Sequence, residues 1–157
     1  MKLWLKEKGK WKLFEGDLTS ELKSRNICIG RWASLGRWAS LGDRATVGDG
    51  ATVGNWATLG DGATLGDWAT LGDWATLGDG ATVLKTLDCI VLGPIGSHES
   101  TLTGYRHENT IWIETECFCG SIGDFEKRVK ETHGENRHAK EYLAAIAYLK
   151  NKFTITD

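Results

Sequence analysis

The sequence has few of the features that mark membrane, exported or nucleic-acid-binding proteins. Its 157 residues include no apolar run long enough to cross a membrane, and lysines follow Met1–Leu5 at once, so no signal peptide is visible. The formal net charge of −2 gives no reason to expect nucleic acid as a partner. The four cysteines fit reduced thiols, and we expect Cys28 and Cys89, which lie in apolar runs, to pack in the core. These absences predict a cytoplasmic protein.

What the sequence does contain is a six-residue repeat that runs without interruption from Ile29 to Val83, of which Leu65–Thr70 is a regular copy. A fixed period without insertions indicates a solenoid, because each unit can bury its apolar side only by stacking on its neighbours. Alternate residues of a strand face opposite sides, so Ala and Leu or Val point inward while Thr and Gly point outward. Copies with Asp-Gly place glycine at the corner, where a tight turn needs positive φ.

The repeat resembles the hexapeptide repeat of left-handed parallel β-helices, which are triangular prisms with three hexads in each coil. The resemblance implies three coils and assembly as a homotrimer. The best-known members are acyltransferases that use a histidine near the trimer interface, but no histidine precedes His98 here and no loop interrupts the repeat. We therefore expect no catalytic residue, no cofactor and no metal, and an acyltransferase stays only as an alternative.

Stacking every third hexad sorts the corner residues onto three edges of the prism. Edge one carries Trp32, Gly50 and Trp68, edge two carries Trp38, Trp56 and Trp74, and edge three carries Arg44, Gly62 and Gly80. Strands in adjacent coils lie about 4.8 Å apart, so edge two is predicted to form a ladder of rings. Exposed tryptophans are costly, and we expect edges one and two to pack against sister subunits. The alternative is a platform on which a ring-bearing ligand or nucleobase stacks.

Charge changes sign along the repeat. The first coil contains Arg31, Arg37 and Arg44, one for each edge, whereas the later coils carry aspartates and no basic residue. This pattern predicts a positive end that attracts an anion. The alternative is an arginine rim that is solvated or paired with neighbouring carboxylates.

The segments on either side of the repeat read as separate modules. Residues 1–28 alternate apolar and basic side chains around Gly9, which predicts a hairpin that caps the open end of the solenoid, followed by a helical turn. The solenoid is assigned to residues 29–92 and an α+β module to residues 93–157. In that module two strands precede two helices, the first of which starts after Ser121 and stops at Gly134. The predicted fold class is mainly β: a three-coil left-handed β-helix with an N-terminal hairpin cap and a C-terminal β-hairpin plus two helices.

The tail carries a second resemblance. Gly96-Ser97, Thr101-Leu102-Thr103, the strand end Cys117-Phe118-Cys119-Gly120 and Thr132-His133-Gly134 resemble the C-terminal module of small hexapeptide-repeat proteins from phages and prophages, over about residues 93–149. Such proteins often have arginine after Gly-Ser, where this chain has His98.

Polar residues of the tail offer hydrogen-bond donors near its start, and donors without acid–base partners suit binding. These candidates are Ser97, His98, Thr101, Tyr105, Arg106, His133 and Asn136. A zinc site at Cys117, Cys119, His133 and His138 is the less favoured alternative, because Cys-x-Cys on one strand lacks the usual turn. Cys117 and His133 as nucleophile and base lack an orienting third group.

The sequence thus predicts a non-enzymatic, homotrimeric binding protein of phage type. We expect it to sequester a small anionic or nucleotide-like ligand, such as an immune signal, at sites between subunits or at the start of the tail. A structural scaffold that binds virion or host proteins is the first alternative.

Overall fold

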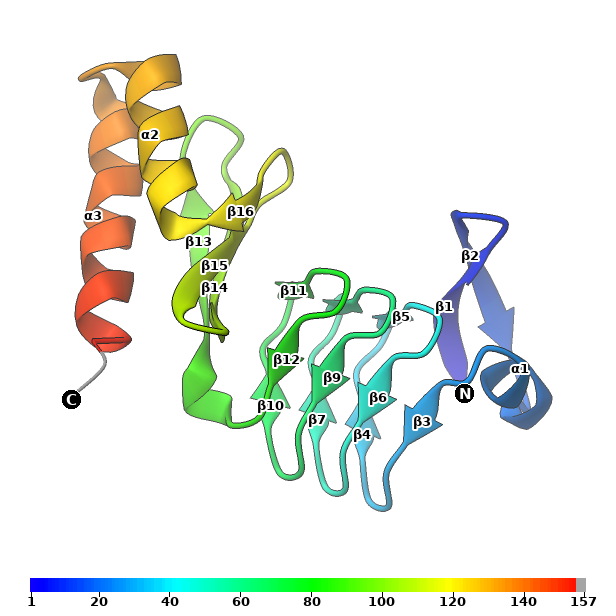
Figure 1. Cartoon of the computed structure of the whole chain (residues 1–157). Helices are drawn as coiled ribbons and strands as arrows, with labels where there is room; N and C mark the ends of the chain where they lie inside the picture. Colours follow the sequence, from blue (N-terminus) through cyan, green and yellow to red (C-terminus); the bar gives the residue numbers. More distant parts are fainter. Residues whose placement is uncertain (155–157) are drawn as a thin grey trace. The chain divides into compact units, whose positions relative to one another are not determined.

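The computed structural model describes residues 1–154, which form two compact units on either side of Leu87 (Figure 1). The predicted boundary after residue 92 moves to residue 87, because β13 (Cys89–Ile95) pairs with β14 (Ser100–His107) and not with a coil. A short 3-10 turn, η1 (Thr86–Asp88), connects the two units. No helix within residues 1–154 is both long and apolar enough to span a membrane.

The N-terminal unit opens with the predicted hairpin, β1 (Lys2–Glu7) and β2 (Lys10–Glu15), and continues into α1 (Thr19–Ser24). β1 also pairs in parallel with a strand of the first coil, so Leu3 and Leu5 are fully buried. The segment therefore caps the solenoid as its alternating pattern predicts.

The solenoid is built of two-residue strands that stack in parallel on three faces, and residues 18 apart are paired. In Figure 1 the strands nearest the viewer run downward and the chain returns upward behind them as the coils advance to the left, so the β-helix is left-handed. The strands are β3 (Cys28–Ile29), β4 (Ser34–Leu35), β5 (Ser40–Leu41), β6 (Thr46–Val47), β7 (Thr52–Val53), β8 (Thr58–Leu59), β9 (Thr64–Leu65), β10 (Thr70–Leu71), β11 (Thr76–Leu77) and β12 (Thr82–Val83).

The predicted inward column of leucine or valine and alanine forms the core, and from Ala39 to Val83 these side chains are at most 1% exposed. Ile29 and Leu35 are only half-buried, because β3 and β4 are the last strands of their sheets whereas β5 is covered by β1. Cys28 is exposed, contrary to our expectation, since it takes the outward position that threonine holds in later coils.

The corners of the solenoid have two fixed positions, and both repeat from coil to coil. The second corner residue has positive φ whether it is glycine, tryptophan or arginine, as at Gly62 (φ 68), Trp56 (φ 58) and Arg44 (φ 62). The first, usually aspartate, accepts the backbone N–H of its counterpart one coil earlier, as Asp67 does from Asp49 at 2.8 Å. The aspartates that we treated only as charge therefore hold neighbouring coils together.

The C-terminal unit is a four-stranded antiparallel sheet in the order β13, β14, β15 (Thr110–Glu114) and β16 (Cys119–Ser121), with α2 (Ile122–His133) and α3 (Arg137–Lys152) packed against it (Figure 1). Ser121 caps α2 by accepting the N–H of Asp124 at 3.1 Å, and Gly134 ends it, as predicted. Burial of the Cys89 thiol in this unit raises its pKa to about 12. The predicted hairpin and two helices are confirmed.

Candidate functional site

The predicted ladder on edge two is present. The rings of Trp38 and Trp56 stack with centroids 5.4 Å apart and planes at 18°, and those of Trp56 and Trp74 stack at 5.2 Å and 5°. The spacing follows from the geometry of the coils, because each ring stands at the same corner position one coil from the next. The ladder is thus a direct product of the repeat.

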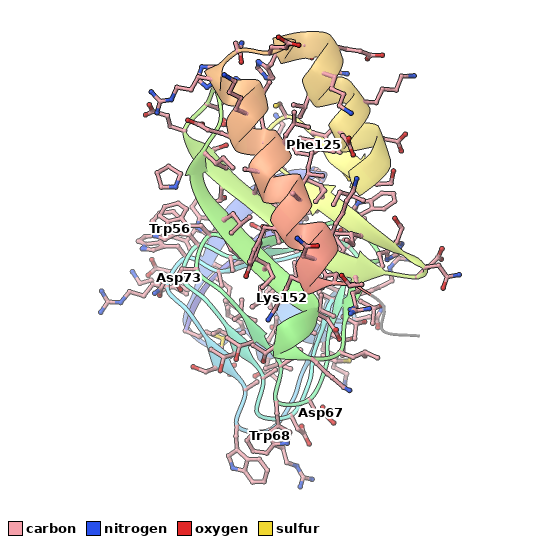
Figure 2. All side chains as sticks on the ribbon, turned by 90° about the vertical axis from the view of Figure 1, so that its left-hand side faces the viewer. Trp56, Asp67, Trp68, Asp73, Phe125 and Lys152 are labelled. Atoms are coloured by element: carbon pink, nitrogen blue, oxygen red, sulfur yellow. The ribbon has the colours of Figure 1, made fainter. Side chains whose placement is uncertain are left out.

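The tryptophans of edge one are arranged differently. A methyl group on Gly50 would overlap the ring of Trp68, so this ring lies across the glycine of the preceding coil. Within residues 1–154 neither Trp32 nor Trp68 stacks on another aromatic ring, and they are 77% and 70% exposed. Figure 2 shows Trp68 and Trp56 pointing outward from different corners of the prism.

The three arginines of the first coil hold two kinds of position. Arg31 and Arg37 stand where later coils have aspartate or asparagine, and their backbone N–H groups donate to Asp49 and Asn55. In later coils the side chain at this position accepts an N–H from the coil before it. No coil precedes the first one at edges one and two, so Arg31 and Arg37 have no such N–H to accept and a carboxylate is not required there.

Arg44 instead takes the positive-φ position and lines a hollow beside carboxylates of Asp43 and Asp61. These carboxylates weaken the attraction of Arg44 for an anion. The three arginines therefore do not make one anion site.

In the C-terminal unit, the structure separates the predicted cluster into two groups. Ser97, His98 and His133 line one cavity. The other four predicted residues do not line it. Thr101 is half-buried in β14, Tyr105 is buried and donates to Glu114 at 3.1 Å, Arg106 pairs with Asp88 at 3.3 Å, and Asn136 caps α3 by accepting the N–H of Ala139 at 3.0 Å.

The cavity has a volume of about 280 Å³ and is formed by four segments of the unit. Its walls come from the β13–β14 connection, the β15–β16 connection and one side of α2 from Phe125 to His133, while α3 contributes Tyr142. Aromatic rings pack together along it: Phe118 and Phe125 are 5.0 Å apart, Phe125 and Tyr142 are 5.4 Å apart, and His133 and Tyr142 are 5.8 Å apart. The cavity thus has a rigid apolar and aromatic wall.

Hydrogen-bond donors surround the remainder of this cavity. Ser97, Thr115 and Thr132 contribute hydroxyl groups, and His98, Arg128 and His133 contribute ring or guanidinium nitrogens. Among residues 1–154 no aspartate or glutamate lines it. Such a lining favours a ligand that is negatively charged and accepts hydrogen bonds, because its charge meets an arginine and no opposing carboxylate.

Arg128 and Thr132 were not predicted from the sequence as site residues. Each lies three positions after an apolar residue of α2, Arg128 after Phe125 and Thr132 after Val129. Their spacing of i and i+4 places them on one side of the helix, which was the available signal. Thr115 and Phe118 come from the connection between β15 and β16. Neither residue belongs to a periodic pattern in the sequence that would have indicated a site.

The two thiols of the tail make separate polar contacts. Cys119 donates to Glu114 Oε1 at 3.1 Å, whereas Cys117 lies in the cavity with its sulfur 3.9 Å from Thr115 Oγ1. In the described part of the chain, residues 1–154, no three His, Cys, Asp or Glu side chains are grouped so that they could hold a metal ion.

Comparisons of the chain with known protein families, with curated proteins and with solved structures found no match.

Proposed function

We propose that the protein is a non-enzymatic binding protein that captures a small anionic, ring-bearing molecule in the cavity of its C-terminal unit. The observation that supports this most strongly is the lining: Arg128, His98 and His133 surround an aromatic wall, and no carboxylate lines the cavity within residues 1–154. The arginine and histidines bind the anionic group while Phe118 and Phe125 contact the ring.

The volume limits the ligand. At about 280 Å³ the cavity lies near the lower end of ligand pockets, so it encloses one ring or one anionic group with its nearest atoms and leaves the rest of a larger ligand outside. A nucleotide is a suitable class, and the resemblance of the tail to phage proteins makes nucleotide messengers of host defence the first compounds to screen.

Binding without turnover is the proposed activity because the residues that line the cavity within residues 1–154 do not form a complete catalytic arrangement. A cysteine nucleophile needs a base held by a third group, and the polar contact of the Cys117 sulfur is with a hydroxyl, that of Thr115. The ring of His133 contacts the rings of His138 and Tyr142, and within residues 1–154 it forms no ion pair with a carboxylate.

A homotrimer remains our proposal for the assembly, with edge one as the contact between subunits. Trp32 and Trp68 favour this edge, because they are more exposed than Trp56 and Trp74, which are 44% and 55% exposed. A scaffold that binds other proteins through the same edge is the second candidate function, supported by the same exposure. An acyltransferase has no specific observation in its favour.

Native mass spectrometry of protein purified from cells identifies a co-purified ligand, and calorimetry then tests the site. We expect His98→Phe or His133→Phe to lower the affinity for that ligand about tenfold, which corresponds to about 1.4 kcal/mol for one lost hydrogen bond to a charged group. The melting temperature should not change, because a ring of similar size remains in place.

His107→Phe is the matched control, since His107 lies in β14 against Trp112 and does not line the cavity. Its affinity should equal that of the parent. If the His98 and His133 variants also bind the ligand as tightly as the parent, the cavity is not the binding site and the tail has a purely structural role.

A further inference from the structure

The tryptophan ladder of edge two ends at a second cavity. One face of the Trp38 ring stacks on Trp56 at 5.4 Å. Beyond Trp38, at the end of the ladder nearest the N-terminal hairpin, lies a cavity of about 420 Å³ lined by Met1, Lys2, Leu35, Gly36, Arg37 and Trp38. All of these residues belong to the N-terminal unit.

The position of β1 explains why the ladder stops here. β1 lies beside β5 as another coil would, with Trp4 opposite Ser40, and Met1 and Lys2 line the cavity together with Arg37 and Trp38. Neither Met1 nor Lys2 carries a ring, and the next step of the ladder is therefore not filled by an indole. A planar ring placed at that step would continue the stacking at the spacing of the existing rings.

The charges around the cavity define the other half of a ligand. Arg37 lines it, and within residues 1–154 its guanidinium makes no ion pair. Lys2 adds a second cation, although it also pairs with Glu15 at 2.7 Å. No carboxylate is among the lining residues in this part of the chain. An anionic group attached to the stacked ring can thus reach Arg37 without contacting a carboxylate of the lining, while Glu15 is held by Lys2.

We infer that this cavity binds a planar ring that carries an anionic group, with the ring stacked on Trp38 and the anion bound by Arg37. A purine nucleoside monophosphate has this chemistry and fits a cavity of this volume. The site is separate from the cavity in the C-terminal unit, so it adds a second binding position in the solenoid.

Calorimetry with adenosine monophosphate tests the site in an Arg128→Gln background, which weakens anion binding in the C-terminal cavity. We expect binding with a stoichiometry of one per chain. Arg37→Gln and Trp38→Leu should each weaken it about tenfold, the scale of one lost charge-assisted bond or one lost base stack. Trp38→Phe keeps a ring and should retain most of the affinity, which separates stacking from a general loss of folding.

The same repeat provides matched controls. Arg31→Gln changes the equivalent arginine on edge one, and Trp74→Leu changes the opposite end of the ladder, so both should bind adenosine monophosphate like the background protein. Adenosine and ribose 5-phosphate test the ring and the anion of the ligand separately. Trp38→Leu should weaken the binding of adenosine and leave that of ribose 5-phosphate unchanged. Arg37→Gln should weaken the binding of ribose 5-phosphate and leave that of adenosine unchanged. Absence of adenosine monophosphate binding in the Arg128→Gln background, or equal loss in the control variants, would overturn the inference while leaving the proposed function untouched.

Discussion

Edges one and two of the solenoid carry the same corner pairs in their first and last coils, Arg-Trp and Asp-Trp, and differ in the middle coil. Edge one has Asp49-Gly50 there, and edge two has Asn55-Trp56. On edge two the middle ring stacks on both neighbours, at 5.4 and 5.2 Å. On edge one the glycine leaves a gap, and the ring of Trp68 lies across it.

Two residues of the middle coil thus give the two edges different surfaces. A ring that stacks on both sides has its two faces covered by other rings, and Trp56 is accordingly less exposed (44%) than Trp68 (70%), so stacking on edge two stabilises the solenoid. Rings without stacking partners keep their faces in water, so edge one is the better surface for another subunit. The backbone is the same in both cases, since Gly50 and Trp56 have φ of 63° and 58°.

The largest expected effect concerns assembly. If edge one is the contact between subunits, Trp68→Asp places a charge in an apolar interface and should convert the trimer to monomers. Burying one tryptophan is worth about 4–6 kcal/mol at about 25 cal/mol per Å², so its loss is sufficient. Light scattering should report one third of the parent mass.

Trp74→Asp makes the same change on edge two and should leave the mass unchanged. A parent mass for both variants would exclude edge one as the contact. Dissociation by Trp74→Asp alone would place the contact on edge two.

The next effect concerns the ladder itself. Trp56→Gly removes two stacked contacts and Trp74→Gly removes one, and each contact is worth about 0.5–1.5 kcal/mol. Denaturant unfolding should therefore show a larger loss for Trp56→Gly, and near-ultraviolet circular dichroism should lose the coupled indole signal.

The converse change, a tryptophan at the middle corner of edge one, tests whether that position alone decides whether an edge forms a stacked ladder. The backbone at Gly50 already has the φ of Trp56, but a Cβ there would overlap the present position of the Trp68 ring. Gly50→Trp should therefore strengthen the coupled signal only if the Trp68 ring turns to stack on the new indole. Equal losses for Trp56→Gly and Trp74→Gly would show that the middle ring contributes no more than a terminal one.

The sequence predicted the solenoid well because its signals are local and repeated. Inward leucines, outward threonines and the corner position recur every six residues, so an error at one copy is corrected by the others. The ladder of Trp38, Trp56 and Trp74 followed from counting three hexads to a coil. The hydrogen bonds from backbone N–H groups to Asp67 and the equivalent aspartates were not predicted. A repeated aspartate is read as a surface charge unless the unpaired N–H groups of each corner are also considered.

The cavity of the C-terminal unit was predicted only in part. Ser97, His98 and His133 were chosen for their chemistry, and the fold brings them together from a loop and a helix end. Tyr105 and Arg106 were chosen on the same grounds and instead form contacts with Glu114 and Asp88. Which donors converge depends on the packing of α2 and α3 on the sheet, and no periodicity in the sequence records that packing.

The smallest expected effect comes from the first corner position of the two edges. On edge one Asp49 donates its N–H to Asp67 at 2.8 Å, so two carboxylates stand one coil apart. On edge two Asn55 makes the same bond to Asp73 at 2.7 Å, and its amide nitrogen also lies 3.4 Å from the second oxygen of that carboxylate. The side-chain oxygen of Asn55 thus still accepts an N–H from the coil before it. Its amide nitrogen faces Asp73 as a donor, where an aspartate would place a second negative charge.

Asp49→Asn should therefore raise the free energy of unfolding by about 0.5 kcal/mol, and Asn55→Asp should lower it by a similar amount, because both sites are exposed and charge effects between exposed groups are small. Urea unfolding at low salt measures both. In about 1 M salt the screening length falls to about 3 Å, below the spacing of the coils, and the two differences should shrink together. Changes of the same sign, or changes that salt does not reduce, would show that the two edges differ in their rings alone and that charge at the first corner position has no part in separating them.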